Sequence, residues 1–375
     1  MILRKTSIYD KFICTADKCP ENCCRGWRIH IDDDTVQKYL DMKGFKGIAL
    51  RLFMHTDDTM PYFSKRAVRC PLMSHDRFCL IQRHIGEECM PEICRRFPRD
   101  IRNYGEFAEF HLDLSCTEAA AILLNNSGSV SLLEYEGETD FPRYGNNDDA
   151  EFLSRLCDSR KKMLSLFDEC SGNIFWLDGA FKKALDIAFS DHERILSVKD
   201  TGRMQEIPGD VFPLSMEVLN EMINNSLYKD EMRYYSSFYY KLFKLYFKYF
   251  DDLSPLRADH VYRAMLGRLL ENVPEIAGNT IEYVRYSIER EYLTTYEDYS
   301  FIKRILDTLI CSNIILLLQA VYFEHYGKLP VKSRARIISL TERRARHNDY
   351  ILRRLSDVFK LESSGYFSGQ FAGEE

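Results

Sequence analysis

Apolar residues recur at intervals of three and four along most of the chain after residue 149. This spacing places them on one face of a helix, so we predict an all-helical domain over residues 149–362. The expected helices, in chain order, are Ala150–Cys170, Ile174–His192, Ser215–Tyr228, Asp230–Phe250, Pro255–Asn272, Pro274–Thr295, Tyr299–Tyr326 and Lys332–Lys360. Residues 363–375 are rich in Gly and Ser and predict a flexible tail.

Three segments of this helical half have unusual patterns. Asp230–Phe250 is apolar around nearly its whole circumference, which favours a place in the core for its Tyr and Phe rings. Lys332–Lys360 is strongly basic, which favours a solvated charged face over contact with an acidic partner. Residues 308–323 form the longest uncharged run, which is shorter than a bilayer span and suits a buried helix. We therefore expect no membrane span.

The patterns in residues 1–125 are shorter and mixed, and they predict a small α+β module. Short β-type runs, some of them alternating, predict strands at residues 12–13, 27–31, 62–63, 78–81 and 107–114. The polar segment 125–148 is the predicted boundary to the helical domain. The fold class expected for the whole chain is therefore mainly α.

Two short helices are expected inside the module. Asp32 is in a position to cap a helix over residues 36–42. Pro91 suits the first turn of a second helix that carries Cys94, and Pro98 would end that helix.

A third helix is predicted where the module ends. Ser115–Glu118 has the sequence of a capping box, and the helix it opens would run to Leu124. Cys116 would then lie at a helix N-terminus, where the pKa of a thiol is lowered.

The composition is that of an ordinary soluble globular protein, with 45% hydrophobic and 29% charged residues. The net charge of −6 argues against binding nucleic acid, which requires a basic face. The first residues lack the apolar core of a signal peptide, so we expect a cytoplasmic protein. In that reducing compartment, closely spaced thiols favour metal binding over disulfides.

Nine of the twelve cysteines fall within residues 14–116, in polar, turn-forming sequence. The close spacing of the first cluster, C-x4-C-x3-C-C, is typical of metal ligands. The predicted ligands are Cys14, Cys19, Cys23, Cys24, Cys70, Cys79, Cys94 and Cys116. Eight thiols exceed the needs of one structural zinc. They could serve one iron–sulfur cluster with spare thiols, two metals, or a cluster and a zinc.

The other cysteines are not expected to bind metal. Cys89 is out of phase with Cys94 and is the expected non-ligand of the region. Cys157, Cys170 and Cys311 lie in helical apolar patterns, and we interpret them as core thiols.

Two interpretations fit the arginines near the cysteines. Arg95, Arg96 and Arg99 could bind a carboxylate, or could form a solvated basic helix end. The nearby histidines are predicted to be surface or structural side chains: His30, His75, His84 and His111.

The cysteine-bearing stretches resemble the flagellin lysine N-methylase family over roughly residues 8–125. The residues that carry the resemblance are Phe12-x-Cys14-x4-Cys19-x3-Cys23-Cys24-x-Gly26-Trp27-x-Ile29-x-Ile31-Asp32, then Cys70-Pro71-x7-Cys79-x-Ile81, Ile85-Gly86, Cys94-x2-Phe97-Pro98-Arg99 and Leu114-Ser115-Cys116. That family has a cysteine-rich N-terminal part related to zinc- or iron-chelating domains, followed by a long helical part. The resemblance implies methylation of flagellin lysines, S-adenosylmethionine as methyl donor and an iron–sulfur cluster, of the 4Fe–4S type, on the matched cysteines. Zinc is the alternative metal.

The sequence lacks the usual signatures of two donor-using classes. We find no strand–glycine turn–helix unit of the kind that binds the donor in doubly wound methyltransferases. The radical-enzyme motif C-x3-C-x2-C is also absent, because Cys24 follows Cys23 directly. A polar, cluster-assisted methyl transfer fits the sequence. The rival interpretation is a non-catalytic metal-binding protein whose helical domain is a partner-binding scaffold.

Overall fold

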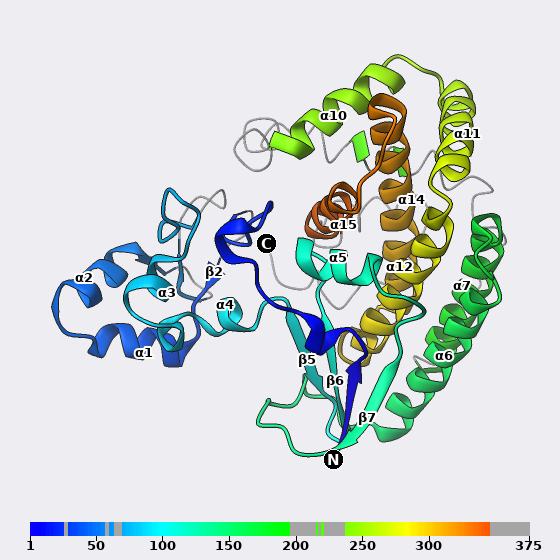
Figure 1. Ribbon diagram of the computed structural model, residues 1–375. Helices are drawn as coiled ribbons and strands as arrows, with labels where there is room; N and C mark the ends of the chain where they lie inside the picture. Colours follow the sequence, from blue (N-terminus) through cyan, green and yellow to red (C-terminus); the bar gives the residue numbers. More distant parts are fainter. Residues whose placement is uncertain are drawn as a thin grey trace, which may run out of the picture.

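The structure is a computed structural model, and it describes residues 1–25, 29–56, 60–63, 70–195, 215–216, 219–220 and 237–345. The described chain is mainly helical, as predicted. Figure 1 shows a small module, built largely from residues 29–96, beside a larger body of long helices, with a sheet below the junction. Four predicted segments lie wholly or partly outside the described residues: the tail at 363–375, most of Ser215–Tyr228, the start of Asp230–Phe250 and the end of Lys332–Lys360.

The long helices of the larger body follow the predicted pattern closely. They are α6 (Ala150–Asp168), α7 (Leu177–Ile195), α10 (Ser237–Phe250), α11 (Pro255–Asn272), α12 (Glu275–Glu291), α14 (Phe301–Tyr326) and α15 (Val331–Ala345). The four-residue helix α13 (Thr295–Asp298) lies between α12 and α14. α14 lies at the centre and packs against α7, α10, α11, α12 and α15.

Helix α14 is buried because its apolar residues face neighbours on nearly all sides. Among the described residues it alone is long and apolar enough to cross a membrane, and 89% of its most apolar window is buried inside the protein. This agrees with the interpretation of residues 308–323 as a buried helix. Cys311 lies in this core, and Cys170 is also buried. Cys157 is half-buried against the same core, as expected for a core thiol.

The rings of α10 are core residues, as the sequence predicted. Tyr239, Phe243 and Tyr246 are buried on one side of this helix. The opposite side bears Lys241 and Lys244, which are exposed. α10 therefore presents a basic stripe to solvent and an aromatic face to α14.

A four-stranded sheet supports the helices, in the order β5-β6-β1-β7. The strands are β1 (Ile2–Thr6), β5 (Arg99–Asn103), β6 (Phe107–Leu112) and β7 (Leu132–Glu136). β1 runs parallel to β6 and antiparallel to β7, while β5 and β6 form an antiparallel pair. Every residue of β6 is buried, because this central strand meets helix α12 through Tyr286, whose hydroxyl donates to Leu112 O at 2.8 Å.

The small module consists of short helices around a three-stranded sheet of order β2-β4-β3. Its elements are β2 (Ile29–His30), α1 (Asp33–Asp41), α2 (Gly44–Phe53), β3 (Met54–His55), β4 (Tyr62–Phe63), α3 (Leu80–His84) and α4 (Glu92–Arg96). Asp32 caps α1 as predicted, accepting from Thr35 N at 3.0 Å. α5 (Thr117–Leu124) follows β6 and belongs to the larger body.

The structure has two hydrophobic cores. One spans Ile8 to Leu340 and joins the sheet to the long helices. The other lies within the module, between Ile29 and Cys94. The predicted domain boundary at residues 125–148 stays a prediction. The two cores separate the small module from the rest of the described chain.

Three local predictions were wrong, and two strands were not predicted. Residues 12–13 follow a 3₁₀ turn (Tyr9–Lys11) and are not a strand, and residues 78–81 lead into helix α3. The N-cap of α5 is Cys116, without a side-chain cap, so the capping box predicted at 115–118 does not form. The strands that were not predicted are β1 and β7, and β7 lies in the segment 125–148 that was predicted as the boundary to the helical domain.

A buried ion pair fixes the sheet against the helices. Arg160 of α6 donates to both carboxylate oxygens of Glu109 on β6, at 2.6 and 2.7 Å, and both side chains are almost completely buried. Burial by itself would raise the pKa of Glu109, but the charge and hydrogen bonds of Arg160 and the hydrogen bond with His111 outweigh it and hold that pKa well below its ordinary value.

We predict that Glu109→Gln lowers the free energy of unfolding by about 3–5 kcal/mol, because it leaves the Arg160 guanidinium buried without its counter-charge. In the wild type, this carboxylate's contribution is fully present above its ordinary pKa of 4.5 and is lost as pH falls toward the lower folded pKa. Urea unfolding at pH 7 and at falling pH measures both effects. Glu134→Gln, which removes an exposed carboxylate paired with Arg4, is the control and should cost less than about 1 kcal/mol. Equal losses in the two variants would contradict the prediction.

Candidate functional site

All the cysteines predicted as metal ligands line one cavity of about 400 Å³. They come from four separate parts of the chain: Cys14, Cys19, Cys23, Cys24, Cys70, Cys79, Cys94 and Cys116. Cys89, the predicted non-ligand, does not line it. The fold therefore collects at one place thiols that are as much as 102 positions apart in the sequence.

The first four cysteines lie on a loop whose own hydrogen bonds keep it compact. The Asn22 side chain accepts from Cys24 N at 2.7 Å and donates to Arg77 O at 2.8 Å. The side chain of Arg77 binds the same loop, because its guanidinium donates to Pro20 O at 3.0 Å. These bonds satisfy backbone groups that a loop without regular structure leaves free.

Cys70 and Cys79 flank a turn that is hydrogen-bonded to this loop. Cys70 N donates to Cys24 O at 2.8 Å, and Met73 and Cys79 form an isolated antiparallel bridge. Cys94 comes from α4, the short helix predicted to carry it. Asp32 joins α4 to α1, because its second carboxylate oxygen accepts from Glu92 N at 2.7 Å. Asp32 is therefore a structural cap, as predicted.

Helix α15, from the far end of the described chain, closes the cavity. Arg336 Nε donates to Glu21 Oε1 at 2.9 Å, and Arg343 Nη2 donates to Glu21 O at 2.9 Å. Arg343 Nε also donates to Ser115 O at 2.7 Å, beside Cys116. The cysteine loop and the turn before α5 are thus both tied to α15, which packs along α5 (Figure 1).

This arrangement corrects the expectation of a solvated basic face on Lys332–Lys360. Arg334 is only 1% exposed and pairs with Glu275 at 2.9 Å. Arg336 and Arg343 bind Glu21 and its neighbours. Within the described part of this helix, the acidic surface that meets these arginines belongs to the same chain.

The thiols around the cavity differ in acidity. The Cys24 thiol donates to the Cys23 sulfur, which lowers the pKa of Cys23 to about 7 and raises that of Cys24. Burial raises the pKa of Cys94, and it raises the pKa of Cys116 to about 12. The helix N-terminus therefore does not give Cys116 the low pKa that its position suggested. A metal that binds these thiols must displace their protons, so its affinity rises with pH.

Thiol side chains are suitable ligands for a thiophilic metal, but these sulfurs do not converge on one position where a single ion could bind. Soft thiolates select zinc, copper(I) and iron–sulfur clusters. Within the ranges that the structure describes, no three His, Cys, Asp or Glu side chains are grouped so that they could hold a metal ion. The thiols instead surround a space, as the walls of a cavity.

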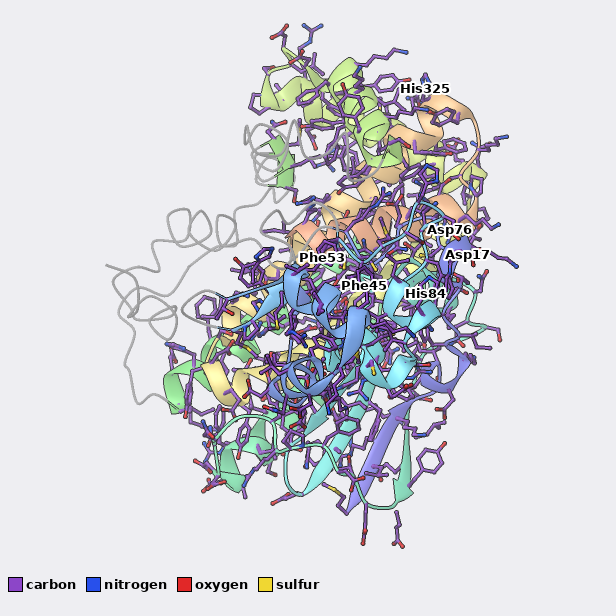
Figure 2. All side chains as sticks on the ribbon, turned by 90° about the vertical axis from the view of Figure 1, so that its left-hand side faces the viewer. Asp17, Phe45, Phe53, Asp76, His84 and His325 are labelled. Atoms are coloured by element: carbon purple, nitrogen blue, oxygen red, sulfur yellow. The ribbon has the colours of Figure 1, made fainter. Side chains whose placement is uncertain are left out.

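Between the cysteines the wall carries aromatic rings and charged side chains of both signs, including Glu21, Glu87 and Glu118. The rings of Phe12, Phe63, Phe78 and Phe97 line it. Arg95, Arg99 and Arg343 also reach it, whereas Arg96 instead pairs with Glu92 at 2.7 Å. The four histidines do not line the cavity. His75 and His84 are exposed, and Figure 2 shows His84 on the module.

A second cavity of about 390 Å³ adjoins the first across residues 97–99, which line both. Its wall is acidic, with the carboxylates of Asp32, Glu92, Asp100 and Asp113. His30 and Arg96 line it as well. Glu92, Asp100 and Asp113 are each paired with an arginine.

Sequence reasoning missed the residues that hold the cysteines in place. Glu21, Asn22 and Arg77 looked like ordinary loop residues. Asn22 offered one signal, because an Asn two residues before a backbone N–H often forms such a turn. Nothing in the sequence linked Glu21 to α15, since that contact spans more than 300 residues.

Together these features define a mainly helical protein with a thiol-lined cavity between a small module and a helical body. The curated relatives it matches include lysine-N-methylases from Salmonella typhimurium and Salmonella choleraesuis and flagellar biosynthetic protein FliU from Salmonella muenchen. Identity is 28% over 130 or 131 residues in each case. These matches confirm the resemblance to the flagellin lysine N-methylase family inferred from the cysteine motif.

The matches are partial. They cover 33% of this chain, 33% and 32% of the two lysine-N-methylases, and 77% of FliU. The chain thus spans about a third of the length of the two methylases. No protein-family profile and no solved structure matches it.

We predict that Glu21→Gln loosens the cysteine loop, because it removes the charge that Arg336 binds. Hydrogen–deuterium exchange should become faster in a peptide covering residues 14–24 and stay unchanged in α14. Glu151→Gln, which removes an exposed carboxylate paired with Arg155, should leave exchange of the loop unchanged. Unchanged exchange in the Glu21 variant would show that the ion pair with Arg336 does not hold the loop.

Proposed function

We propose that this protein is an S-adenosylmethionine-dependent lysine N-methyltransferase that acts on flagellin and uses an iron–sulfur cluster held by the cavity cysteines. The observation that carries the proposal is the convergence of all the motif cysteines on one cavity. The names of the curated relatives support the reaction and the flagellar substrate. A reducing cytoplasm suits both the free thiols and an intracellular donor.

The reaction is a displacement at the methyl carbon. The bond from the donor sulfonium to the methyl carbon breaks as a bond from the lysine nitrogen forms, and one proton leaves the amine. S-adenosylhomocysteine and methyl-lysine are the products. The lysine must be neutral, in line with the methyl group and shielded from water.

The cysteine cavity has the properties of a donor site. Its volume of about 400 Å³ is within the range of small-molecule sites. Ring faces of Phe12 and Phe97 suit the sulfonium cation. Arg343 and Arg99 offer guanidinium groups to the donor's carboxylate.

The arrangement of the thiols favours a cluster over a lone zinc. A zinc ion needs its four sulfurs at about 2.3 Å from one point. In a cluster each thiolate binds a different iron, so the thiolates surround a larger body. The described thiols surround a space in this way. The cavity cysteines would hold the cluster, and the chemistry it would supply is a Lewis-acidic iron for the amino and carboxylate groups of the donor.

The acidic second cavity is the place we propose for the substrate lysine. Its carboxylates attract the ammonium side chain, and residues 97–99 separate it from the cysteine cavity by a single turn of chain. Removal of the ammonium proton must precede transfer. Asp100 and Asp113 are paired with Arg102 and Arg290, so these carboxylates are held in fixed positions.

Anaerobic purification followed by an absorbance spectrum, metal and sulfide analysis, and a methyl-transfer assay tests the proposal. We expect a brown protein that transfers labelled methyl groups from S-adenosylmethionine to flagellin lysines. Cys24→Ser should abolish transfer and reduce bound iron, because this half-buried thiol lines the cavity next to Cys23.

Cys89→Ser is the matched control, because this cysteine belongs to the same region but lies off the cavity. It should retain iron and transfer at wild-type levels. A colourless zinc protein that does not bind the donor would overturn the proposal and support a metal-stapled scaffold.

A further inference from the structure

One carboxylate of the second cavity differs from the other three. Glu92, Asp100 and Asp113 are paired with arginines. Asp32 instead accepts hydrogen bonds from Thr35 N and Thr35 Oγ1, both at 3.0 Å, and from Glu92 N at 2.7 Å. These donors carry no charge, and the part of the chain that the structure describes gives Asp32 no ion pair. Its negative charge is therefore available to a cation that enters the cavity.

The hydrogen bonds keep Asp32 ionised. Burial alone would raise the pKa of its carboxyl group, but the bonds from Glu92 N and from Thr35 outweigh burial and hold that pKa below its ordinary value. The four carboxylates of the cavity face only two arginines in its wall, Arg96 and Arg99. This excess of negative charge favours a cationic ligand.

His30 lies on the same side of the chain as Asp32. The backbone is extended here, because β2 pairs with β4 and the next residue, Ile31, donates its N–H to Pro61 O at 2.8 Å. Side chains alternate between the two faces of an extended chain. Ile29 and Ile31 are accordingly buried in the module core, whereas His30 and Asp32 both line the second cavity.

The same cavity has an exposed apolar surface. Met60 and Ile93 line it, and they are 42% and 39% exposed. A lysine side chain has a flexible apolar stem and a compact ammonium group with three N–H donors. The apolar surface suits the stem, and the carboxylate of Asp32 suits the ammonium group.

We infer that Asp32 binds the ammonium group of the substrate lysine and that His30 accepts its proton before methyl transfer. This inference rests on the proposed function and assigns residues to its lysine site. An N–H bond of the ammonium breaks, and its electron pair stays on nitrogen as the lone pair that attacks the methyl carbon. The proton is bound by an imidazole nitrogen of His30, which is exposed and can pass it to water.

Asp32 supports both states of this step. The two residues are about 7 Å apart along the strand, so the carboxylate first attracts the lysine ammonium and afterwards stabilises the imidazolium. The other cavity carboxylates also favour an imidazolium, whereas Arg96 and Arg99 oppose it. Two further elements pack against β2. β4 contributes Tyr62, which pairs with His30, and the titratable or charged residues of α4 beyond the cavity wall are Cys94 and Arg95.

Steady-state methylation of flagellin by the full-length, metal-loaded protein tests the binding role of Asp32. Asp32→Asn removes the charge but keeps a cap for α1, because Asn caps helices as well as Asp does. We expect KM for flagellin to rise about 10-fold, because a charge-assisted hydrogen bond is lost, and KM for S-adenosylmethionine to stay the same. Met60→Lys places a cation at an exposed position of the same cavity and should raise the same KM. An unchanged KM in both variants would overturn the binding role.

The pH dependence of kcat tests the role of His30. His30→Gln should lower kcat about 100-fold at pH 7, because the proton acceptor is lost. The loss should shrink as pH rises toward 10, since more of the lysine is then neutral without a base. An equal loss at every pH would mean a structural role and would contradict the inference. The controls are Asp34→Asn and His84→Gln, which change exposed side chains of the same module outside both cavities and should match the wild type.

A binding measurement separates this inference from the proposed function. Ligand-observed NMR compares Nα-acetyl-lysine methyl amide with its Nε-acetylated counterpart, which has no charge. The wild type should prefer the charged ligand and Asp32→Asn should lose that preference, whether or not methyl transfer occurs. A wild type without the preference would overturn the inference. If flagellin is not methylated, the proposed function fails. If an active enzyme keeps its KM and pH dependence in the Asp32, Met60 and His30 variants, the inference fails while the proposed function stands.

Discussion

The contact between Glu21 and helix α15 is the constraint on which the cavity depends. Glu21 lies among four cysteines that have little regular structure of their own, and its carboxylate and carbonyl bind Arg336 and Arg343. Because Arg343 also binds Ser115 O, one helix positions the loop and Cys116 together. The thiol cavity is therefore formed by both halves of the chain and is not a property of the cysteine-rich part alone.

Buried charges extend this constraint into the helical body. Arg290 of α12 donates to Glu342 of α15 at 3.1 Å and to Asp113, just before Cys116, at 3.2 Å. Arg290 and Glu342 are almost completely buried. Buried pairs of this kind add little net stability, but removing one partner is costly. They fix the orientation of α15, and with it the direction in which its arginines point.

The sequence was informative where a residue's role is local, and less so where it is set by distant contacts. The helical spacing located α11 and α14 closely, and the cysteine motif found every thiol that lines the cavity. The strand β1 was missed because its pairing with β6 and β7 is decided more than 100 residues away. The basic helix was misread for the same reason, since the acid that it binds is near the other end of the chain.

The cavity has one wall in each hydrophobic core. Cys24, Cys70, Cys79 and Cys94 pack in the module core, whereas Cys14, Cys19 and Cys23 lie on the loop that Arg336 and Arg343 bind. A methyl donor bound there, as we propose, would meet guanidinium groups, ring faces and thiols at once. Such a site would need no doubly wound sheet, because the donor would be bound by side chains and a metal centre and not by a glycine-rich turn.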